Sequence, residues 1–157
     1  MIFGKKYQIV WLIGFIFLAS SCLNSDECVE ETYSSPKAFN LKLVDEDGIN
    51  LISENGYNID SIDLYYKSNL GSTRVPIDFL EISDGFLLTS SELPYTVLET
   101  SNNTYFLYLN AQDSDTLTIN VLRENDGCST WHRYVDCMFN GAIMDLDPEY
   151  YAYLGVK

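Results

Sequence analysis

Apolar and polar residues alternate along most of the chain after residue 38, and this period of two constrains the fold more than any other feature. Successive side chains of a β-strand point to opposite faces of a sheet, so such alternation predicts strands with one buried face. Turns rich in Asn, Asp, Gly and Ser separate the alternating runs. Short strands with regular turns predict an all-β antiparallel sandwich. The runs lie at residues 39–44, 49–52, 61–66, 75–79, 86–89, 95–98, 105–109, 116–121 and 131–139.

Three local signals refine this prediction. Asp45-Glu46-Asp47-Gly48 between two runs predicts a hairpin, and Pro76 marks its run as an edge strand because proline cannot donate to a neighbouring strand. Asp147-Pro148-Glu149 predicts the start of a short C-terminal helix that stops at Gly155.

The first residues have the composition of a secretory signal. Lys5 and Lys6 precede an uncharged run, residues 9–19, and Ser20-Ser21-Cys22 follows. Eleven apolar residues are too few to span a bilayer, which takes about 20. We therefore expect residues 1–21 to be a signal peptide that is removed, and the mature protein not to cross a membrane.

The segment Leu18-Ala19-Ser20-Ser21-Cys22 resembles a lipobox, the motif cut by the bacterial lipoprotein signal peptidase. The resemblance implies that Cys22 becomes the lipidated N-terminus, with a fatty-acyl anchor such as palmitate. Ala19 and Ser21 also satisfy the ordinary cleavage rule of two small residues. A secreted protein with Cys22 as a plain thiol is therefore the alternative.

Leu23, rather than Asp, follows Cys22, and by the same resemblance this implies sorting to the outer membrane. Residues 22–37 are then a lipidated cysteine and acidic tether, and 38–157 are the folded domain. Acidic stretches in this position resemble a surface-export signal of some Gram-negative lipoproteins. Display on the cell surface and a plain solvated linker are both left open.

The mature chain is strongly acidic. Two of the nine basic residues leave with the signal, so seven basic and 23 acidic side chains give a formal charge of −16. This charge disfavours nucleic acid, whose phosphates would be repelled. It is compatible with a basic protein partner, and it also favours solubility.

Four cysteines are present: Cys22, Cys28, Cys128 and Cys137. If Cys22 is lipidated, an exported protein is expected to form one disulfide from the other three. The predicted strand between Cys128 and Cys137 holds these two far apart, so Cys28 is one partner. We predict Cys28–Cys128, with Cys28–Cys137 as the alternative. Either bridge ties the tether to the last hairpin.

The layout from Asp113-Ser114-Asp115-Thr116-Leu117 to Phe139-Asn140-Gly141, with the acidic tether and an early strand, resembles small uncharacterised lipoproteins of Gram-negative bacteria. The resemblance implies an immunoglobulin-like or transthyretin-like sandwich. It transfers no catalytic residues.

Enzyme chemistry is poorly supported. His132 is the only histidine and lies in a predicted strand, without a nucleophile motif or a phosphate-binding loop. We expect no enzyme activity, no cofactor and no metal. The acidic pairs Asp45/Asp47 and Asp113/Asp115 have oxygen ligands that calcium accepts, but neither continues as an EF-hand loop, so they are interpreted as turn acids.

Tyrosines are the remaining candidate surface, for a glycan or for a protein. Packing in the sheets is the competing interpretation. The sequence thus predicts a non-enzymatic, lipid-anchored accessory or interaction module, with a binding protein or inhibitor for a basic partner, or a glycan-binding module, as alternatives. The tyrosines concerned are Tyr65, Tyr66, Tyr105, Tyr108, Tyr150, Tyr151 and Tyr153.

Overall fold

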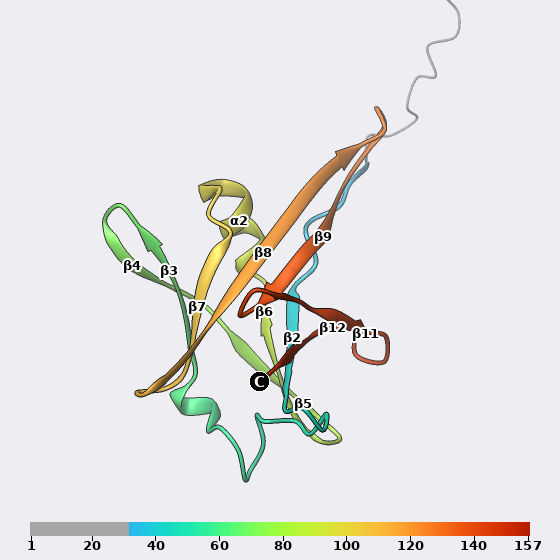
Figure 1. Cartoon of the computed structure of the whole chain (residues 1–157). Coiled ribbons are helices and arrows are strands. Elements are labelled where there is room, and N and C mark those ends of the chain that lie inside the picture. Colours follow the sequence, from blue (N-terminus) through green and yellow to red (C-terminus); the bar gives the residue numbers. More distant parts are fainter. Residues whose placement is uncertain (1–31) are drawn as a thin grey trace, which may run out of the picture. The chain divides into compact units, whose positions relative to one another are not determined.

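Two sheets packed face to face make up the computed structural model, which describes residues 32–157 (Figure 1). The first sheet has the order β1-β9-β8-β7-β3-β4, with β10 also beside β9, and the second has the order β11-β12-β2-β6-β5. Neighbouring strands are antiparallel, except that β1 is parallel to β9 and β12 to β2. The predicted all-β antiparallel sandwich is confirmed; its finer assignment as immunoglobulin-like or transthyretin-like stays a prediction.

The strands of the first sheet are β1 (Thr32–Tyr33), β3 (Asp63–Ser68), β4 (Gly71–Val75), β7 (Thr104–Asn110), β8 (Asp113–Asn125), β9 (Ser129–Phe139) and β10 (Ala142–Ile143). Those of the second sheet are β2 (Phe39–Val44), β5 (Asp78–Ile82), β6 (Gly85–Ser90), β11 (Asp145–Asp147) and β12 (Ala152–Val156). A 3-10 turn, η2 (Ile59–Ser61), and a helix, α2 (Leu93–Thr100), complete the described elements.

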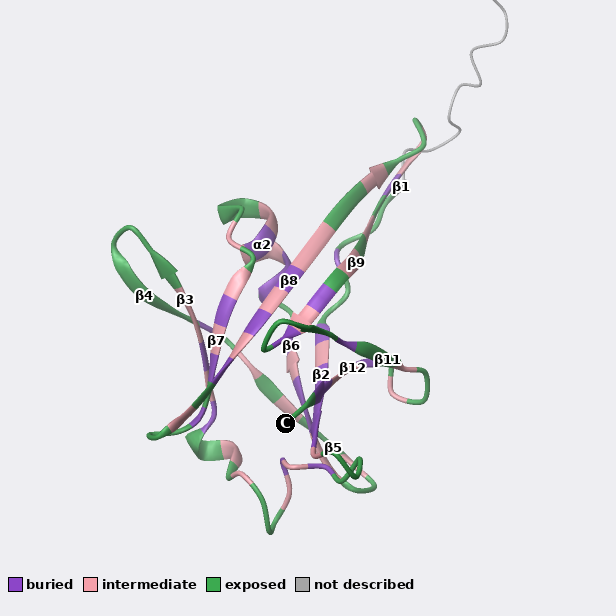
Figure 2. Cartoon of the chain, viewed as in Figure 1, coloured by how far each residue is buried: buried purple, intermediate pink, exposed green. Residues whose placement is uncertain are grey.

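The core lies between the two sheets and follows from the alternation. In β2, Phe39, Leu41 and Leu43 are fully buried, and in β7 every second residue is also fully buried. Figure 2 shows the buried segments on the central strands, with exposed residues at the turns and the hairpin ends. The period of two therefore identified the inward faces correctly.

Two predicted strands are placed differently. Residues 49–52 do not form a strand: only Asn50 bridges to Val44, and Asn50 Oδ1 then accepts the N–H of Ile52, which bends the chain. The predicted strand 75–79 is divided, since β4 ends at Val75 and β5 begins at Asp78. Pro76 lies at this break, and the two strands form edges of different sheets.

The predicted strand 95–98 is wrong, because these residues belong to the helix α2. Pro94 stands in its first turn, where a missing N–H costs nothing. Leu93 and Val97, four residues apart, are both buried, and Ser101 ends the helix with a left-handed φ of 54°. A run this short is compatible with both the two-residue period of a strand and the roughly 3.6-residue period of a helix.

The predicted C-terminal helix is also wrong. Residues 145–156 form the β11–β12 hairpin instead. The Asp147 side chain accepts the N–H of Glu149 at 2.9 Å, which is the bond a helix cap would make, but here it serves a turn. Gly155 lies within β12, not at a helix end.

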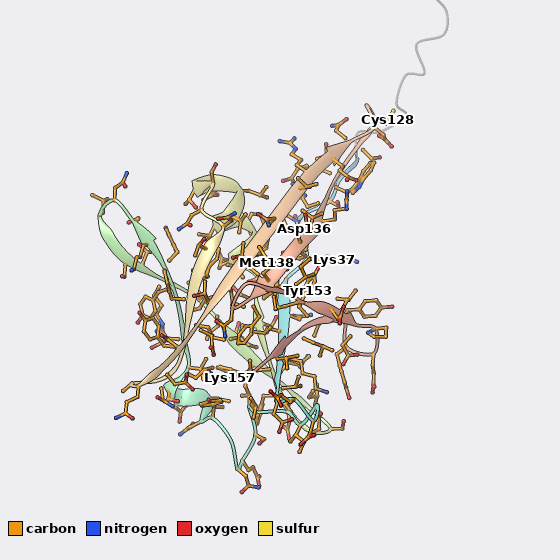
Figure 3. All side chains as sticks on the ribbon, in the orientation of Figure 1. Lys37, Cys128, Asp136, Met138, Tyr153 and Lys157 are labelled. Atoms are coloured by element: carbon orange, nitrogen blue, oxygen red, sulfur yellow. The ribbon has the colours of Figure 1, made fainter. Side chains whose placement is uncertain are left out.

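The β8–β9 hairpin is the longest feature and extends past the other strands (Figure 1). A bulge interrupts its ladder between Thr118 and Asn120, opposite Asp136, whose φ of 46° is left-handed. Beyond the bulge, β1 pairs with Ser129 and Thr130. Figure 3 places Cys128 at the tip of this hairpin.

The described folded unit runs from Thr32 to Lys157 and so includes residues 32–37 of the predicted tether. Residues 32–37 of the predicted tether thus lie along the hairpin. Within residues 32–157, no helix is long and apolar enough to span a bilayer. The predicted signal peptide, Cys22 and Cys28 lie outside the described residues.

Candidate functional site

The outer face of the first sheet, turned away from the core, carries a group of aromatic side chains. In β7, Tyr105 and Leu107 face the core, so Phe106 and Tyr108 point outward. Tyr65 of β3 is paired with Phe106 and lies on the same face. Three aromatic rings from two neighbouring strands are therefore gathered where solvent reaches them.

One end of this face is hollowed into a pocket of about 340 Å³, which we call the outer pocket. The rings of Tyr65 and Tyr108 form two of its walls, with centroids 5.6 Å apart and planes at 87°. Tyr108 keeps 41% of its surface exposed. The lining residues come from η2, β3 and the end of β7: Ser61, Asp63, Tyr65, Tyr108, Asn110 and Ala111.

The negative charge of Asp63, the carboxylate that lines the pocket, is balanced by an arginine on the neighbouring strand β4. Arg74 Nη2 of β4 lies 2.5 Å from Asp63 Oδ1. This oxygen is buried and accepts no hydrogen bond of good geometry, so the contact is an ion pair without hydrogen-bond alignment. The pocket therefore carries polar atoms but little net charge.

Two further polar groups at the pocket are fixed by their own loops. The Ser61 hydroxyl lies 2.7 Å from both the Asn58 and the Leu109 carbonyl oxygens. Asn110 Oδ1 accepts the N–H of Gln112 at 2.8 Å, which fixes the amide plane and leaves its NH₂ group to donate elsewhere. The pocket rim is thus preorganised.

Three of the other candidate tyrosines, Tyr66, Tyr105 and Tyr153, serve packing. Tyr105 is fully buried beside Tyr66, and its hydroxyl donates to the Asn102 carbonyl at 2.9 Å. Burial raises the pKa of the Tyr105 hydroxyl far above its usual value. Tyr153 stacks on Phe39 with centroids 5.5 Å apart.

Tyr150 and Tyr151 lie on the β11–β12 connection. The Tyr150 hydroxyl lies 3.0 Å from Ser83 Oγ, and its ring lies under the Lys42 ammonium. Tyr151 is 76% exposed. Of the seven candidates, Tyr65 and Tyr108 are the two that line the outer pocket.

The two acidic pairs are engaged within the fold. Asp45 Oδ1 accepts the N–H groups of Asp47 and Ile49, as a turn acid does. Asp113 and Asp115 both contact Lys157 Nζ, at 2.8 and 2.7 Å. No group of three metal-ligating side chains gathers among residues 32–157.

The Asp113 cluster also shifts a pKa. Hydrogen bonds from Lys157 and from the Tyr57 hydroxyl lower the pKa of the Asp113 carboxyl below its usual value. Figure 3 shows Lys157 far from the hairpin tip. This cluster holds the end of the described chain against the start of β8.

Cys137 is a free, buried thiol whose pKa is raised by burial. The alternative bridge to Cys137 is therefore not formed. The predicted Cys28–Cys128 bridge stays a prediction, because Cys28 lies outside the described residues. Asp126 shapes the turn around Cys128 by accepting the N–H groups of Cys128 and Ser129.

His132 lies on the projecting hairpin. Its Nδ1 is 3.0 Å from the Ser34 carbonyl oxygen, and its ring meets the Tyr33 ring edge-on. These contacts fasten the first described residues to β9.

The sequence interpretation missed most of the outer pocket. It named Tyr65 and Tyr108 but not Ser61, Asp63, Arg74 or Asn110. The alternation along the predicted strand indicated part of the site. Leu64 is buried, so residues 63 and 65 lie together on the opposite, outer face. The pairing of β4 with β3 through a two-residue turn, Asn69-Leu70, brings Arg74 to this face.

Comparison with known proteins gave no significant match to any family model, curated protein or solved structure.

Proposed function

We propose that this protein is a lipid-anchored, non-enzymatic binding module of the outer membrane, and that it binds its ligand at the outer pocket. One observation carries the proposal: the outer pocket and the start of the folded unit lie at opposite ends of the β8–β9 hairpin. The pocket includes Asn110 and Ala111, just before β8, whereas Thr32 pairs with Ser129, just after the hairpin tip.

The length of β8 separates these two ends. Its 13 residues span about 40 Å at about 3.3 Å per residue. An anchor that joins the fold at Thr32 leaves the pocket at the other end of the sheet. Such a placement suits a module that presents a site to ligands beyond the surface to which it is tethered.

The predicted Cys28–Cys128 bridge would strengthen this arrangement. Cys128 lies at the hairpin tip (Figure 3). Only six residue steps separate Cys22 from Cys28, which reach about 20 Å when fully extended. A bridged chain would therefore keep the hairpin tip close to the bilayer and turn the pocket away from it.

The alternative, an inhibitor of a basic partner, receives less support from the charges. Such an inhibitor would present an acidic projecting element, because opposite charges guide association. The projecting hairpin instead carries Arg123, His132 and Arg133 alongside its acidic residues. At the outer pocket, Asp63 is already paired with Arg74.

The anchor is tested by expressing the full chain in a Gram-negative host with a labelled fatty acid. We expect the unchanged protein to carry the label and to fractionate with the outer membrane. Cys22→Ala should lose the label and leave the membrane fraction, and Cys137→Ser, which alters a buried thiol, is the matched control. Equal labelling of the Cys22→Ala chain would contradict the anchored module.

A further inference from the structure

We propose that the ligand of the outer pocket is a neutral sugar ring, either free or as the end of a glycan; this rests on the proposed function. The shape of the walls is the first reason. The rings of Tyr65 and Tyr108 meet at 87° and form a corner. A ligand that stacks its flat face on one ring must therefore meet the other ring with its rim.

A pyranose fits such a corner because its two surfaces differ. Its flat faces carry C–H groups, which are attracted to the negative face of an aromatic ring. Its rim carries hydroxyl groups, which both donate and accept hydrogen bonds. An aromatic ligand would have an apolar rim and would leave the polar lining groups without partners, which is unfavourable.

Polar side chains also line the pocket and can bond to the hydroxyl groups of the rim. The Asn110 NH₂ group is free to donate, because the Asn110 oxygen already accepts from Gln112. Arg74 Nη2 contacts Asp63 Oδ1, and the second carboxylate oxygen, Oδ2, can accept a hydrogen bond from a ligand hydroxyl. Carboxylate, amide and aromatic groups together are the combination that holds a polyhydroxylated ring.

The electrostatics select a neutral sugar. The Asp63–Arg74 pair cancels the charge that would attract an amino sugar or a lysine side chain. The formal charge of −16 on the mature chain repels uronic acids and phosphates. A neutral ring meets no repulsion from the acidic chain and needs no unpaired carboxylate in the pocket.

The volume of the pocket, about 340 Å³, lies near the lower end of small-molecule sites, which start at about 300 Å³, and suits one sugar ring. A single ring at an open site is expected to bind with a Kd in the millimolar range. Repeated units on a glycan, met by many anchored copies, would strengthen this binding through avidity.

The test uses the full, acylated chain in a detergent without a sugar headgroup. Its ligands are methyl glucoside, methyl galactoside, methyl mannoside, glucosamine, glucuronate and a hexalysine peptide. Saturation-transfer NMR detects binding, and titration gives the Kd. We expect at least one neutral methyl glycoside to bind with a millimolar Kd, and glucuronate not to bind.

Three substitutions locate the site. Tyr108→Ala should weaken binding about tenfold or more because it removes one wall. Tyr108→Phe keeps the ring and should stay within about threefold. Tyr151→Ala, a matched control at an exposed tyrosine outside the pocket, should leave the Kd unchanged.

Arg74→Gln tests the charge argument without touching a wall. It leaves the negative charge of Asp63 without its ion pair. The ratio of the Kd for glucosamine to the Kd for the methyl glycoside should therefore fall by about fivefold or more. This variant and Tyr108→Phe keep the test valid even where Tyr108→Ala does not fold.

The outcomes separate this inference from the proposed function. Salt-sensitive binding of hexalysine in preference to sugars, lost in Tyr108→Ala, overturns the sugar and keeps the binding module. The sugar site is overturned if the Kd for sugar is unchanged by the Tyr108 and Arg74 substitutions. It is also overturned if no sugar binds at concentrations up to tens of millimolar. The lipid anchor is tested independently, by the fatty-acid labelling of Cys22.

Discussion

Gly155 shows how a single residue in this chain can be misinterpreted. A glycine after Asp147-Pro148 predicts a helix stop, but Gly155 is buried in a strand. A β-carbon built at this position would lie 3.1 Å from the Phe139 ring and 3.2 Å from Leu41. The sequence marks the glycine but cannot show that a ring from β9 packs against it.

Gly155→Ala should therefore lower the free energy of unfolding by about 1–3 kcal/mol, the usual cost of overpacking a core. Urea unfolding of the full chain in detergent would measure this. Val156→Ala, at the next and half-exposed residue, should cost less than about 1 kcal/mol. An unchanged stability for Gly155→Ala would show that this part of the core is loosely packed.

Asp113 gives a prediction of pH dependence. Its pKa is lowered by Lys157 and Tyr57, so the ionised form is favoured in the fold. This contribution to stability is fully present above the unfolded pKa of about 3.9 and is lost as the pH falls through the lower folded value. Asp113→Asn should lower stability at neutral pH and flatten its decline below about pH 4.

Urea unfolding across this pH range measures the effect. Asp60→Asn, which removes one exposed carboxylate on the nearby turn η2, is the matched control. An equal slope for the Asp113→Asn chain and the unchanged chain would contradict the assigned cause.

At the scale of elements, the sequence identifies those strands whose alternation is long. β2, β3, β7, β8 and β9 are all found, because several alternating residues in each agree on one buried face. The failures are short segments: residues 95–98 are helical, and residues 147–155 form a turn and a strand. A run of only four residues, such as 95–98, fits both the strand and the helix period, so tertiary packing decides between them.

The bulge in β9 is an element that alternation cannot reveal. Asp136 adopts a φ of 46°, a region that Asp tolerates and β-branched residues avoid. Asp136→Val should therefore cost about 1–2 kcal/mol of stability, whereas Asp136→Gly should be close to neutral. Thermal unfolding of both variants measures this, and equal losses for Val and Gly would argue against a strained bulge.

At the scale of the whole molecule, the alternation predicted two layers but not which face carries the site. The outer pocket needs η2, β3, β4 and β7, which are brought together by the order of strands in the first sheet. Non-local pairing of this kind is not encoded in any single run of residues. Composition predicted the charge, yet the local neutrality at Asp63 depends on one neighbour, Arg74.

The display of the outer pocket away from the anchor can be measured directly. A fluorophore is introduced at Ala111, at the pocket, or at Asn125, at the hairpin tip, and the acylated chain is inserted into vesicles that carry an acceptor dye in the bilayer. The display geometry predicts weaker energy transfer from Ala111, which lies up to about 40 Å farther from the membrane than Asn125. Equal transfer from both positions, or stronger transfer from Ala111, would contradict it.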